Sequence, residues 1–383
     1  MHPEKAIVAG EAWSFDLEGY ASVKECCVVQ EPTVFADVTT TWRGRKLPLK
    51  RETENSWVNV FWRGQLIDVV SIAWTAACGY NQRYWIIAEN RQLAEDFFRA
   101  VCEWSTAVRG EILVFADGEW SKNRELYRAI KSATFDKVIL QESLKASIQA
   151  DFAQFFAARD FYERHGIPWK RGVLFIGPPG NGKTQTVKAL INQLNQPCLY
   201  VKGFQAEHGT EQENIRRVFA RARFTMPCLL VMEDLDSMIE QKSISFFLNE
   251  LDGFETNTGV VVLGTTNHPE RLDPAILERP SRFDRKYYFG LPEAVERRAY
   301  FVAWNLDLRP ELRMSDAAAP ELVRQTAGFS FAYLKELVLS AMMQWMTQGG
   351  SMSMDAVLLE QINQLRQQMT AAEKSSEQPS REK

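Results

Sequence analysis

The segment GVLFIGPPGNGKTQTVKAL, residues 172–190, constrains the fold more than any other part of the chain. An apolar run suited to a buried strand leads into a glycine-rich loop, and a helical pattern follows it. The loop fits G-x-x-x-x-G-K-[ST] with Gly177, Gly182, Lys183 and Thr184. Backbone N–H groups in such a loop, and at the start of the helix, converge on a phosphate group. We therefore expect a phosphate-binding loop, against the alternative of a strand-to-helix turn without a ligand.

The side chains of this loop indicate a nucleoside triphosphate with Mg²⁺. Lys183 is expected to reach the β- and γ-phosphates, and Thr184 to offer its hydroxyl to the metal ion. The expected cofactor-binding residues are Gly177, Pro178, Pro179, Gly180, Asn181, Gly182, Lys183, Thr184 and Gln185.

A pair of carboxylates follows the apolar run CLLVM in the segment CLLVMEDLDS, residues 228–237. A buried strand here would deliver both acids to its carboxyl end, where such a pair suits Mg²⁺ and an attacking water. By position, Asp234 would polarise the water and Glu233 would face the metal. The order Glu-Asp, in place of the usual Asp-Glu, leaves that assignment open, and two solvated acids are the alternative. The expected metal ligands are Thr184, Glu233 and Asp234.

A third motif lies in VVVLGTTNHPERLDPAILERPSRFDRKYYFGLP, residues 260–292. After a buried strand, Asn267 is placed to orient the attacking water. Arg279 and Arg282 are candidate arginine fingers that would stabilise transition-state charge on the γ-phosphate of a neighbouring subunit. Arg285 is a weaker candidate, and for each arginine a salt bridge is the alternative.

The order of strand-like and helical patterns predicts the domain organisation. Strands and helices alternate from Ile167, as in a parallel sheet covered by helices, and strands cease after Pro292. Upstream, residues 57–74 read as a hairpin turning at Arg63-Gly64, and residues 111–116 as a further strand. We expect an α+β N-terminal region (1–142), a linking helix (143–166), a large α/β subdomain (167–292), a helical lid (293–370) and a disordered tail (371–383).

Charge, cysteine usage and apolar runs narrow the class of protein. A formal net charge of −4 and a pI near 5.8 argue against nucleic acid as a partner. The six cysteines include no CxxC pair, which fits a reducing compartment. The segment MHPEKAIVAG has no apolar signal core, and the longest apolar run is well short of the ~20 residues of a membrane helix. We expect a cytoplasmic protein without a membrane segment.

Over residues 165–345 these motifs together resemble the AAA family of ATPases. The resemblance is carried by GPPGNGKT, TTNHPERLDPAILERPSRFDR and GFSFAYLKEL (328–337), in the family's order. It implies ATP and Mg²⁺ as cofactors, ATP hydrolysis, and Asn267 as a sensor. It also implies a homo-oligomeric ring of six or seven subunits in which Arg279 and Arg282 complete the neighbour's site, a protein substrate or partner, and a lid from Gly328 that touches the adenine side.

The upstream sequence is similar to one branch of that family. The segments WRGQ, GEILVFADGEW and FYERHGIPWKRGVLFIGPPGNGKT, with the Glu-Asp order, look like the branch containing the mitochondrial chaperone that inserts the Rieske iron–sulfur protein into respiratory complex III. That chaperone carries an N-terminal transmembrane helix, which this sequence does not show. Its membrane location and its substrate are therefore not carried over.

The segment GFQAEHGTEQENIRRVF, residues 203–219, stands where threading motors of the family carry a gripping loop with an exposed aromatic residue. Here the positions are Ala206, Glu207, His208 and Gly209, and Phe204 is assigned to the strand end. We expect a chaperone-like or translocase-like ATPase that works on a protein without threading it. The alternative is an ATP-controlled assembly switch or scaffold that recruits an effector. A DNA-remodelling ATPase is disfavoured by the charge balance.

Overall fold

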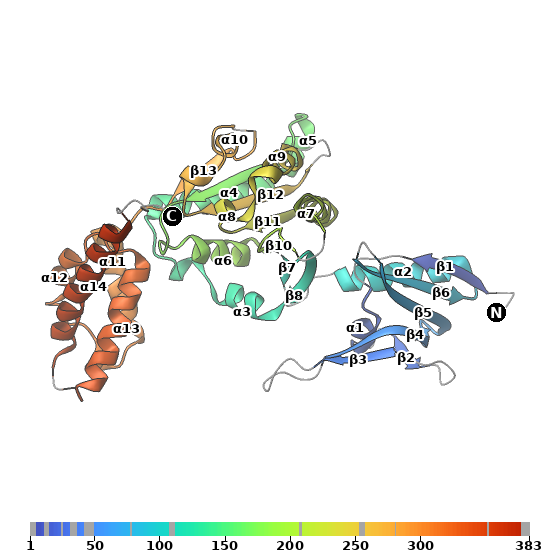
Figure 1. Ribbon diagram of the computed structural model, residues 1–383, viewed down its shortest axis with the longest axis horizontal. Coiled ribbons are helices and arrows are strands. Elements are labelled where there is room, and N and C mark those ends of the chain that lie inside the picture. The colour runs from blue at the N-terminus through green and yellow to red at the C-terminus, as the bar shows by residue number, and fades with distance from the viewer. Residues whose placement is uncertain are drawn as a thin grey trace, which may run out of the picture. The chain divides into compact units, whose positions relative to one another are not determined.

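The computed structural model describes residues 5–10, 15–23, 26–30, 37–41, 50–76, 79–106, 112–206, 209–252, 257–279, 281–350 and 352–376. The chain divides into two compact units, Met1–Gly110 and Glu111–Lys383, which are described separately (Figure 1). Within the described part of the chain, no helix combines the length and the apolar character that crossing a bilayer requires.

Unit 1 is an antiparallel sheet with one long helix on one face. Its strands pair in the order β1-β6-β5-β4-β2, and β3 pairs with β4. The strands are β1 (Ala6–Gly10), β2 (Cys27–Gln30), β3 (Asp37–Thr41), β4 (Lys50–Trp62), β5 (Gln65–Ala76) and β6 (Gly79–Ala88), and the helices are α1 (Leu17–Ser22) and α2 (Arg91–Thr106). The predicted hairpin is confirmed, because β4 and β5 pair across Arg63 and Gly64, both of which have positive φ.

The two faces of this sheet differ because side chains alternate along each strand. Val60, Trp62, Ile67 and Val69 are buried together with Phe97 of α2. The opposite face carries residues such as Trp57, Phe61 and Trp74, which are 38%, 53% and 44% exposed.

Unit 2 is built on a seven-stranded sheet in the order β13-β9-β12-β11-β10-β7-β8. Its strands are β7 (Ile112–Ala116), β8 (Glu119–Asn123), β9 (Arg171–Ile176), β10 (Cys198–Val201), β11 (Cys228–Met232), β12 (Val260–Thr266) and β13 (Arg285–Tyr288). All neighbouring pairs are parallel except β7 with β8. Strands β11 and β12 are buried along their whole length, as strands covered on both faces must be. The predicted α/β fold, a parallel sheet covered by helices after an N-terminal α+β region, is confirmed.

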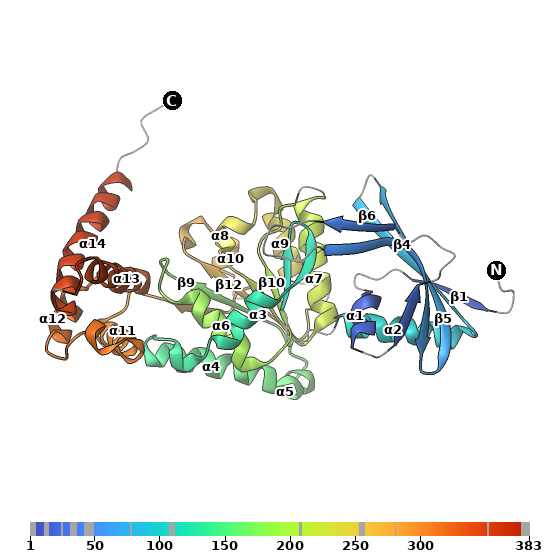
Figure 2. The ribbon, with the colours of Figure 1, turned by 90° about the horizontal axis from the view of Figure 1, so that it is seen from below.

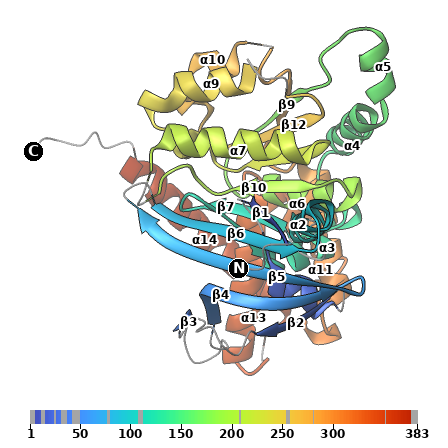
Figure 3. The ribbon, with the colours of Figure 1, turned by 90° about the vertical axis from the view of Figure 1, so that its right-hand side faces the viewer.

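Helices cover both faces of this sheet (Figure 3). On one face, residues of α3, α4 and α6 share a core cluster with β7, β9 and β12. On the other face, α7 packs against α9 through Phe219 and Phe247. The elements are α3 (Arg124–Ser132), η1 (Phe135–Lys137), α4 (Glu142–Ala157), α5 (Arg159–Arg164), α6 (Lys183–Leu194), α7 (Glu211–Thr225), α8 (Leu235–Met238), η2 (Gln241–Ser243), α9 (Ile244–Asp252), η3 (Pro269–Arg271) and α10 (Pro274–Leu277).

Strands β7 and β8 extend the sheet of unit 2, although their residues fall in the region 1–142 that the sequence assigned to the N-terminal part. Leu199, Tyr200 and Val201 of β10 pair with residues 113–115 of β7. The expected boundary at residue 142 therefore lies inside unit 2, and the observed boundary lies at Gly110 and Glu111. Pairing between strands so distant in sequence leaves no local signal, which is why the pattern alone misplaced them.

The expected linking helix over 143–166 is observed as two helices, α4 and α5, separated at Ala158. The indole N–H of Trp169 donates to the carbonyl oxygen of Phe155 at 3.0 Å, and the N–H of Ala158 donates to the same oxygen at 3.3 Å. The last turn of α4 is thus closed by a tighter bond and a side-chain donor, which ends the regular helix there.

After β13 the described chain is helical (Figure 2). The elements are α11 (Ala294–Asp307), η4 (Pro310–Leu312), α12 (Ala319–Gln325), α13 (Phe331–Thr347) and α14 (Met354–Ser376). They share a separate core that includes Phe301, Leu322, Leu337 and Leu358. Helix α14 continues into the segment expected as a disordered tail, and residues 377–383 lie outside the described part of the chain.

Candidate active site

The glycine-rich loop connects β9 to α6 as the sequence predicts. Gly182, the N-cap of α6, has φ of 91°, a conformation that favours glycine. A Cβ on Gly177 would lie 2.1 Å from the carbonyl oxygen of Phe289, which follows β13. Both positions therefore require glycine, and their backbone forms a tight concave turn at the N-terminus of α6. Such a turn is a ready anion-binding site.

Lys183 lies in the first turn of α6 and is buried. Its ammonium group donates to the carbonyl oxygens of Gly177 at 2.5 Å and Pro178 at 3.0 Å. Burial lowers the pKa of Lys183, while the charges of Asp234, Asp236 and Glu233 act in the opposite direction. The ammonium group is thus held against the loop and close to the acidic residues that follow β11.

Asn181 is 1% exposed, and neither its amide nitrogen nor its amide oxygen has a hydrogen-bond partner among the described residues. Unpaired buried polar atoms are costly and uncommon in folded proteins. A polar ligand in the loop would satisfy them. The free amide of Asn181, the glycine turn and the buried ammonium group of Lys183 therefore fit a bound phosphate group.

The other expected loop residues lie at the open side of the same turn. Those that are exposed are Pro178, Pro179, Gly180, Thr184 and Gln185. The N–H of Ala332 in α13 donates to the carbonyl oxygen of Gly180 at 3.1 Å. The segment that begins at Gly328 therefore contacts the loop directly, as expected of a lid.

Glu233 follows the buried strand β11 and is tied to β10. The phenol of Tyr200 donates a short hydrogen bond to one carboxylate oxygen of Glu233, while the other oxygen is buried without a partner in the described part of the chain. Burial raises the pKa of Tyr200, and the negative charge of Glu233 raises it further. Tyr200 is therefore a hydrogen-bond donor, and it leaves one oxygen of Glu233 free for a cation.

Asp234 adopts a left-handed conformation with φ of 54° and is exposed. Its N–H donates to the hydroxyl oxygen of Thr265 at 3.0 Å, and its Oδ1 accepts a hydrogen bond from the amide of Asn267 at 2.8 Å. The structure therefore brings the predicted acid and the predicted sensor together at the ends of adjacent parallel strands.

Within the described residues, no group of three or more His, Cys, Asp or Glu side chains is placed to hold a metal ion. Mg²⁺ does not need such a group, because it usually binds to one or two carboxylates together with substrate phosphates and water. The hydroxyl of Thr184 and the carboxylates of Glu233 and Asp234 are the donors that would hold it.

The two candidate finger arginines differ in their surroundings. Arg279 is exposed, and its side chain has no ion-pair partner among the described residues. Arg282 is 6% exposed and donates to Oδ2 of Asp252 at 3.0 and 2.8 Å and to the carbonyl oxygen of Ala275 at 2.8 Å. Arg282 is therefore in the salt-bridge arrangement that the sequence left open, and Arg285 lies 3.6 Å from Asp151.

Sequence reasoning missed Tyr200 and Asp236. Asp236 accepts a hydrogen bond at 2.7 Å from the hydroxyl of Thr266, whose strand carries Asn267. Its position two residues after Asp234 in the same motif was an available signal. Tyr200 gave no such signal, because it meets Glu233 only through the pairing of β10 with β11.

Comparison with known proteins places this site in a family. The model of the family described as "ATPase family associated with various cellular activities (AAA)" matches residues 173–291. The chain is similar to "ATP-dependent zinc metalloprotease FtsH" of Acaryochloris marina, with 31% identity over 66% of this chain and 40% of that protein. It is also similar to "ATP-dependent zinc metalloprotease YME1L1" of Homo sapiens, with 31% identity over 58% of this chain and 30% of that protein.

The matched residues contain the loop, both acids, Asn267 and both finger arginines. The chain spans less than half the length of these relatives. The similarity supports the AAA resemblance but does not extend to the particulars of the Rieske-inserting chaperone. With the P-loop between β9 and α6 and the acid–amide pair beyond β11 and β12, residues 173–291 form an AAA ATPase domain.

Proposed function

We propose that this protein is a ring-forming AAA ATPase that hydrolyses ATP with Mg²⁺ to drive conformational work on a protein substrate, without threading it. The carrying observation is the convergence of Lys183, Glu233 and Asp234 around a loop whose buried Asn181 lacks a partner among the described residues. Mg²⁺ would polarise the phosphoryl group, and this chain's own residues would bind the phosphates and orient the water.

Ring formation is supported by the surroundings of the two arginines. Transition-state charge on a transferred phosphoryl group is commonly stabilised by an arginine. Arg279 is exposed and has no ion-pair partner in the described part of its own chain, whereas Arg282 is held by Asp252. We assign Arg279 to the neighbouring subunit's site, and a role for Arg282 requires its ion pair with Asp252 to open.

Work without threading is supported by the loop after β10. Phe204 is the sole Phe, Tyr or Trp between residues 202 and 210, and it is fully buried against Phe247. The carbonyl oxygen of Phe204 also accepts a hydrogen bond from Asn214 at 2.8 Å. This aromatic ring is therefore part of the core. Glu207 and His208, which the sequence places at the tip, lie outside the described residues.

A protein substrate is supported by the relatives, whose names describe ATP-dependent proteases. Zinc proteases of one large class carry His-Glu-x-x-His, in which two histidines bind zinc and the glutamate is the base. The sequence printed above contains no such motif. Our proposal takes from the relatives ATP-driven action on proteins and does not include peptide-bond hydrolysis by this chain.

The similarity of the upstream motifs to the Rieske-chaperone branch favours handling of folded substrates, because that branch moves its cargo folded. The substrate and the membrane of that chaperone are not part of the proposal. The cytoplasmic location expected from the sequence stays a prediction.

The function is tested with the Asp234→Asn protein in ATP, imaged as single particles and scored for ring stoichiometry and for the width of the central opening. A closed ring around a cavity wide enough for a folded domain supports the proposal. A narrow-pored spiral, together with unfolding of a stably folded tagged substrate by the wild-type protein, overturns the non-threading part.

A second candidate function, an ATP-controlled scaffold, is favoured by the aromatic face of unit 1. Trp57, Phe61 and Trp74 are exposed on the sheet face opposite α2, and exposed apolar patches mark interaction sites. Slow turnover that no substrate alters, with ATP-dependent capture of one stoichiometric partner, would favour this function over the first.

A further inference from the structure

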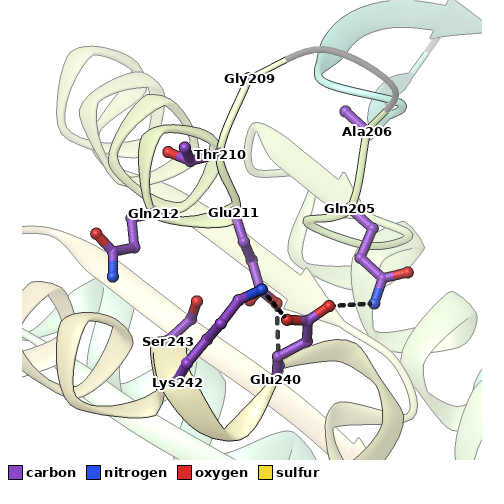
Figure 4. A pocket seen from close by; sticks show the side chains of 9 residues that line it. All are labelled: Gln205, Ala206, Gly209, Thr210, Glu211, Gln212, Glu240, Lys242 and Ser243. Carbon is purple, nitrogen blue, oxygen red and sulfur yellow. Dashed lines mark hydrogen bonds and ion pairs between the residues drawn. The ribbon is translucent and has the colours of Figure 1, made fainter.

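A polar cavity of about 530 Å³ lies beside the start of α7, away from the nucleotide loop (Figure 4). Its walls come from three segments: residues 205–206 after β10, residues 209–212 at the start of α7, and residues 240–243 around η2. None of the residues assigned to the nucleotide site lines it. The cavity therefore needs a separate explanation.

Most polar groups in the cavity wall are paired with one another. The N–H of Glu240 donates to Oε1 of Glu211 at 3.0 Å, and Gln205 donates to Oε1 of Glu240 at 3.2 Å. Lys242 lies 2.6 Å from the second carboxylate oxygen of Glu240, as the dashed lines in Figure 4 show. These contacts fix the position of Glu211 and leave its second oxygen unpaired within the described part of the chain.

Two buried oxygens of the wall have no hydrogen-bond partner among the described residues: Oε2 of Glu211 and Oγ of Ser243. Ser243 is 1% exposed, and its side chain points toward the space beside Glu211 (Figure 4). A buried carboxylate oxygen and a buried hydroxyl without partners are each unfavourable. A ligand that brings hydrogen-bond donors would satisfy both at once.

The charges of the wall select the kind of donor. Glu211 and Glu240 contribute two negative charges and Lys242 one positive charge, so these residues together leave one net negative charge. A primary ammonium group carries three N–H donors and no acceptor, so it suits a carboxylate and a hydroxyl that both lack a donor. A carboxylate or phosphate ligand would instead be repelled by Glu211.

We propose that this cavity binds a primary ammonium group of a polypeptide, either a lysine side chain or a free amino terminus. Lys242 does not fill the site, since its ammonium group is engaged by Glu240 and neither unpaired oxygen has a partner within the described ranges. The proposal rests on the proposed function in one respect, namely that the ligand belongs to a protein substrate. It assigns to the region after β10 a polar contact in place of an aromatic one.

The experiment measures binding of fluorescein-labelled peptides to the full-length protein with ADP, by fluorescence anisotropy. One peptide has a single central lysine and a blocked amino terminus, a second has norleucine in place of lysine, and a third has a free amino terminus and no lysine. Binding of the first or third, and not of the norleucine peptide, is expected. Equal binding of all three would overturn the proposal.

Three variants test the named groups. Glu211→Gln and Ser243→Ala should each weaken binding, the former by about tenfold because a charge-assisted hydrogen bond is lost. Lys242→Gln should tighten it, because a competing positive charge is removed. The control is Glu311→Gln in η4, which removes the same charge as Glu211→Gln from an exposed position that does not line the cavity, and it should leave binding unchanged.

The signs decide between explanations. If Lys242→Gln weakens binding as much as Glu211→Gln does, the ligand is not a cation, and the assignment fails. If Glu311→Gln weakens binding equally, the attraction is a general charge effect, and the assignment also fails. Peptide binding that survives without any protein-stimulated ATP turnover would overturn the proposed function alone, and stimulated turnover without peptide binding would overturn this site alone.

Discussion

Asn267 donates its side-chain amide to Asp234 at 2.8 Å, across the ends of two neighbouring parallel strands. Thr265, on the strand that carries Asn267, accepts the backbone N–H of Asp234 at 3.0 Å. Asp234 is thereby held in its left-handed conformation with an exposed carboxylate beside an amide. Glu233 instead accepts a hydrogen bond from Tyr200. The two adjacent acids therefore have different partners, which is the physical basis for giving them different roles.

Asp234→Asn should bind ATP but hydrolyse it at least about 100-fold more slowly, because the carboxylate that would polarise the water is lost. Glu233→Gln should mainly raise the Mg²⁺ concentration needed for half-maximal turnover, since it removes a charge on the metal. Steady-state ATP turnover and binding of a fluorescent ATP analogue across a Mg²⁺ series separate the two effects. If Glu233→Gln traps bound ATP and Asp234→Asn does not, the two acids have the opposite roles.

Tyr200→Phe should lower stability by roughly 1 kcal/mol, the usual net value of a lost hydrogen bond, and should shift the Mg²⁺ dependence of turnover. The reason is that Glu233 loses the donor that orients it. Tyr287→Phe is the matched control, because the phenol of Tyr287 donates to Asp151 at 3.1 Å, outside the site. Thermal melts and Mg²⁺ titrations of both variants give the result. An unchanged Mg²⁺ dependence in Tyr200→Phe would show that Tyr200 only stabilises the fold.

Lys183→Ala should abolish nucleotide binding, because it removes the buried ammonium group held against the loop. Lys188→Ala, further along α6 and outside the loop, is the control and should bind ATP normally. Isothermal titration with ATP and Mg²⁺ measures both. Normal affinity in Lys183→Ala would refute the assignment of the phosphate site.

The parts of this site that sequence reasoning found are those written in contiguous segments. The loop at Lys183 and the acids after β11 each follow from a strand pattern and a few adjacent residues, because the chemistry itself requires that spacing. Asn267 was found in the same way, from its place directly after a buried strand.

The parts that it missed depend on contacts between distant segments. Tyr200 reaches Glu233 only because β10 lies beside β11, and β7 joins the sheet only through its register with Leu199. The pairing of Arg282 with Asp252 similarly spans 30 residues. Periodicity reports which face of an element is buried, and it carries no information on which partner covers that face.

Phe204→Ala should destabilise the fold by roughly 3–5 kcal/mol, as expected for deleting a fully buried aromatic ring, and should not change how a substrate is held. Phe224→Ala, whose ring is 73% exposed, is the control and should melt close to the wild type. Chemical denaturation measures the free energy of unfolding of both variants. A Phe204→Ala protein of normal stability with lost substrate handling would place this ring in a gripping role after all.

Arg279→Ala and Arg282→Ala should both lower ATP turnover with little loss of ATP binding, but they should differ in stability. Arg282 is buried in an ion pair with Asp252, so its removal leaves that carboxylate unpaired and should lower the melting temperature. Arg279 is exposed, so its removal should leave the melting temperature unchanged. Mixing Arg279→Ala protein with Lys183→Ala protein should restore part of the turnover, because one subunit then supplies the nucleotide site and the other the arginine. If no mixing ratio restores turnover, the site is not shared between subunits, and the ring assignment loses its main support.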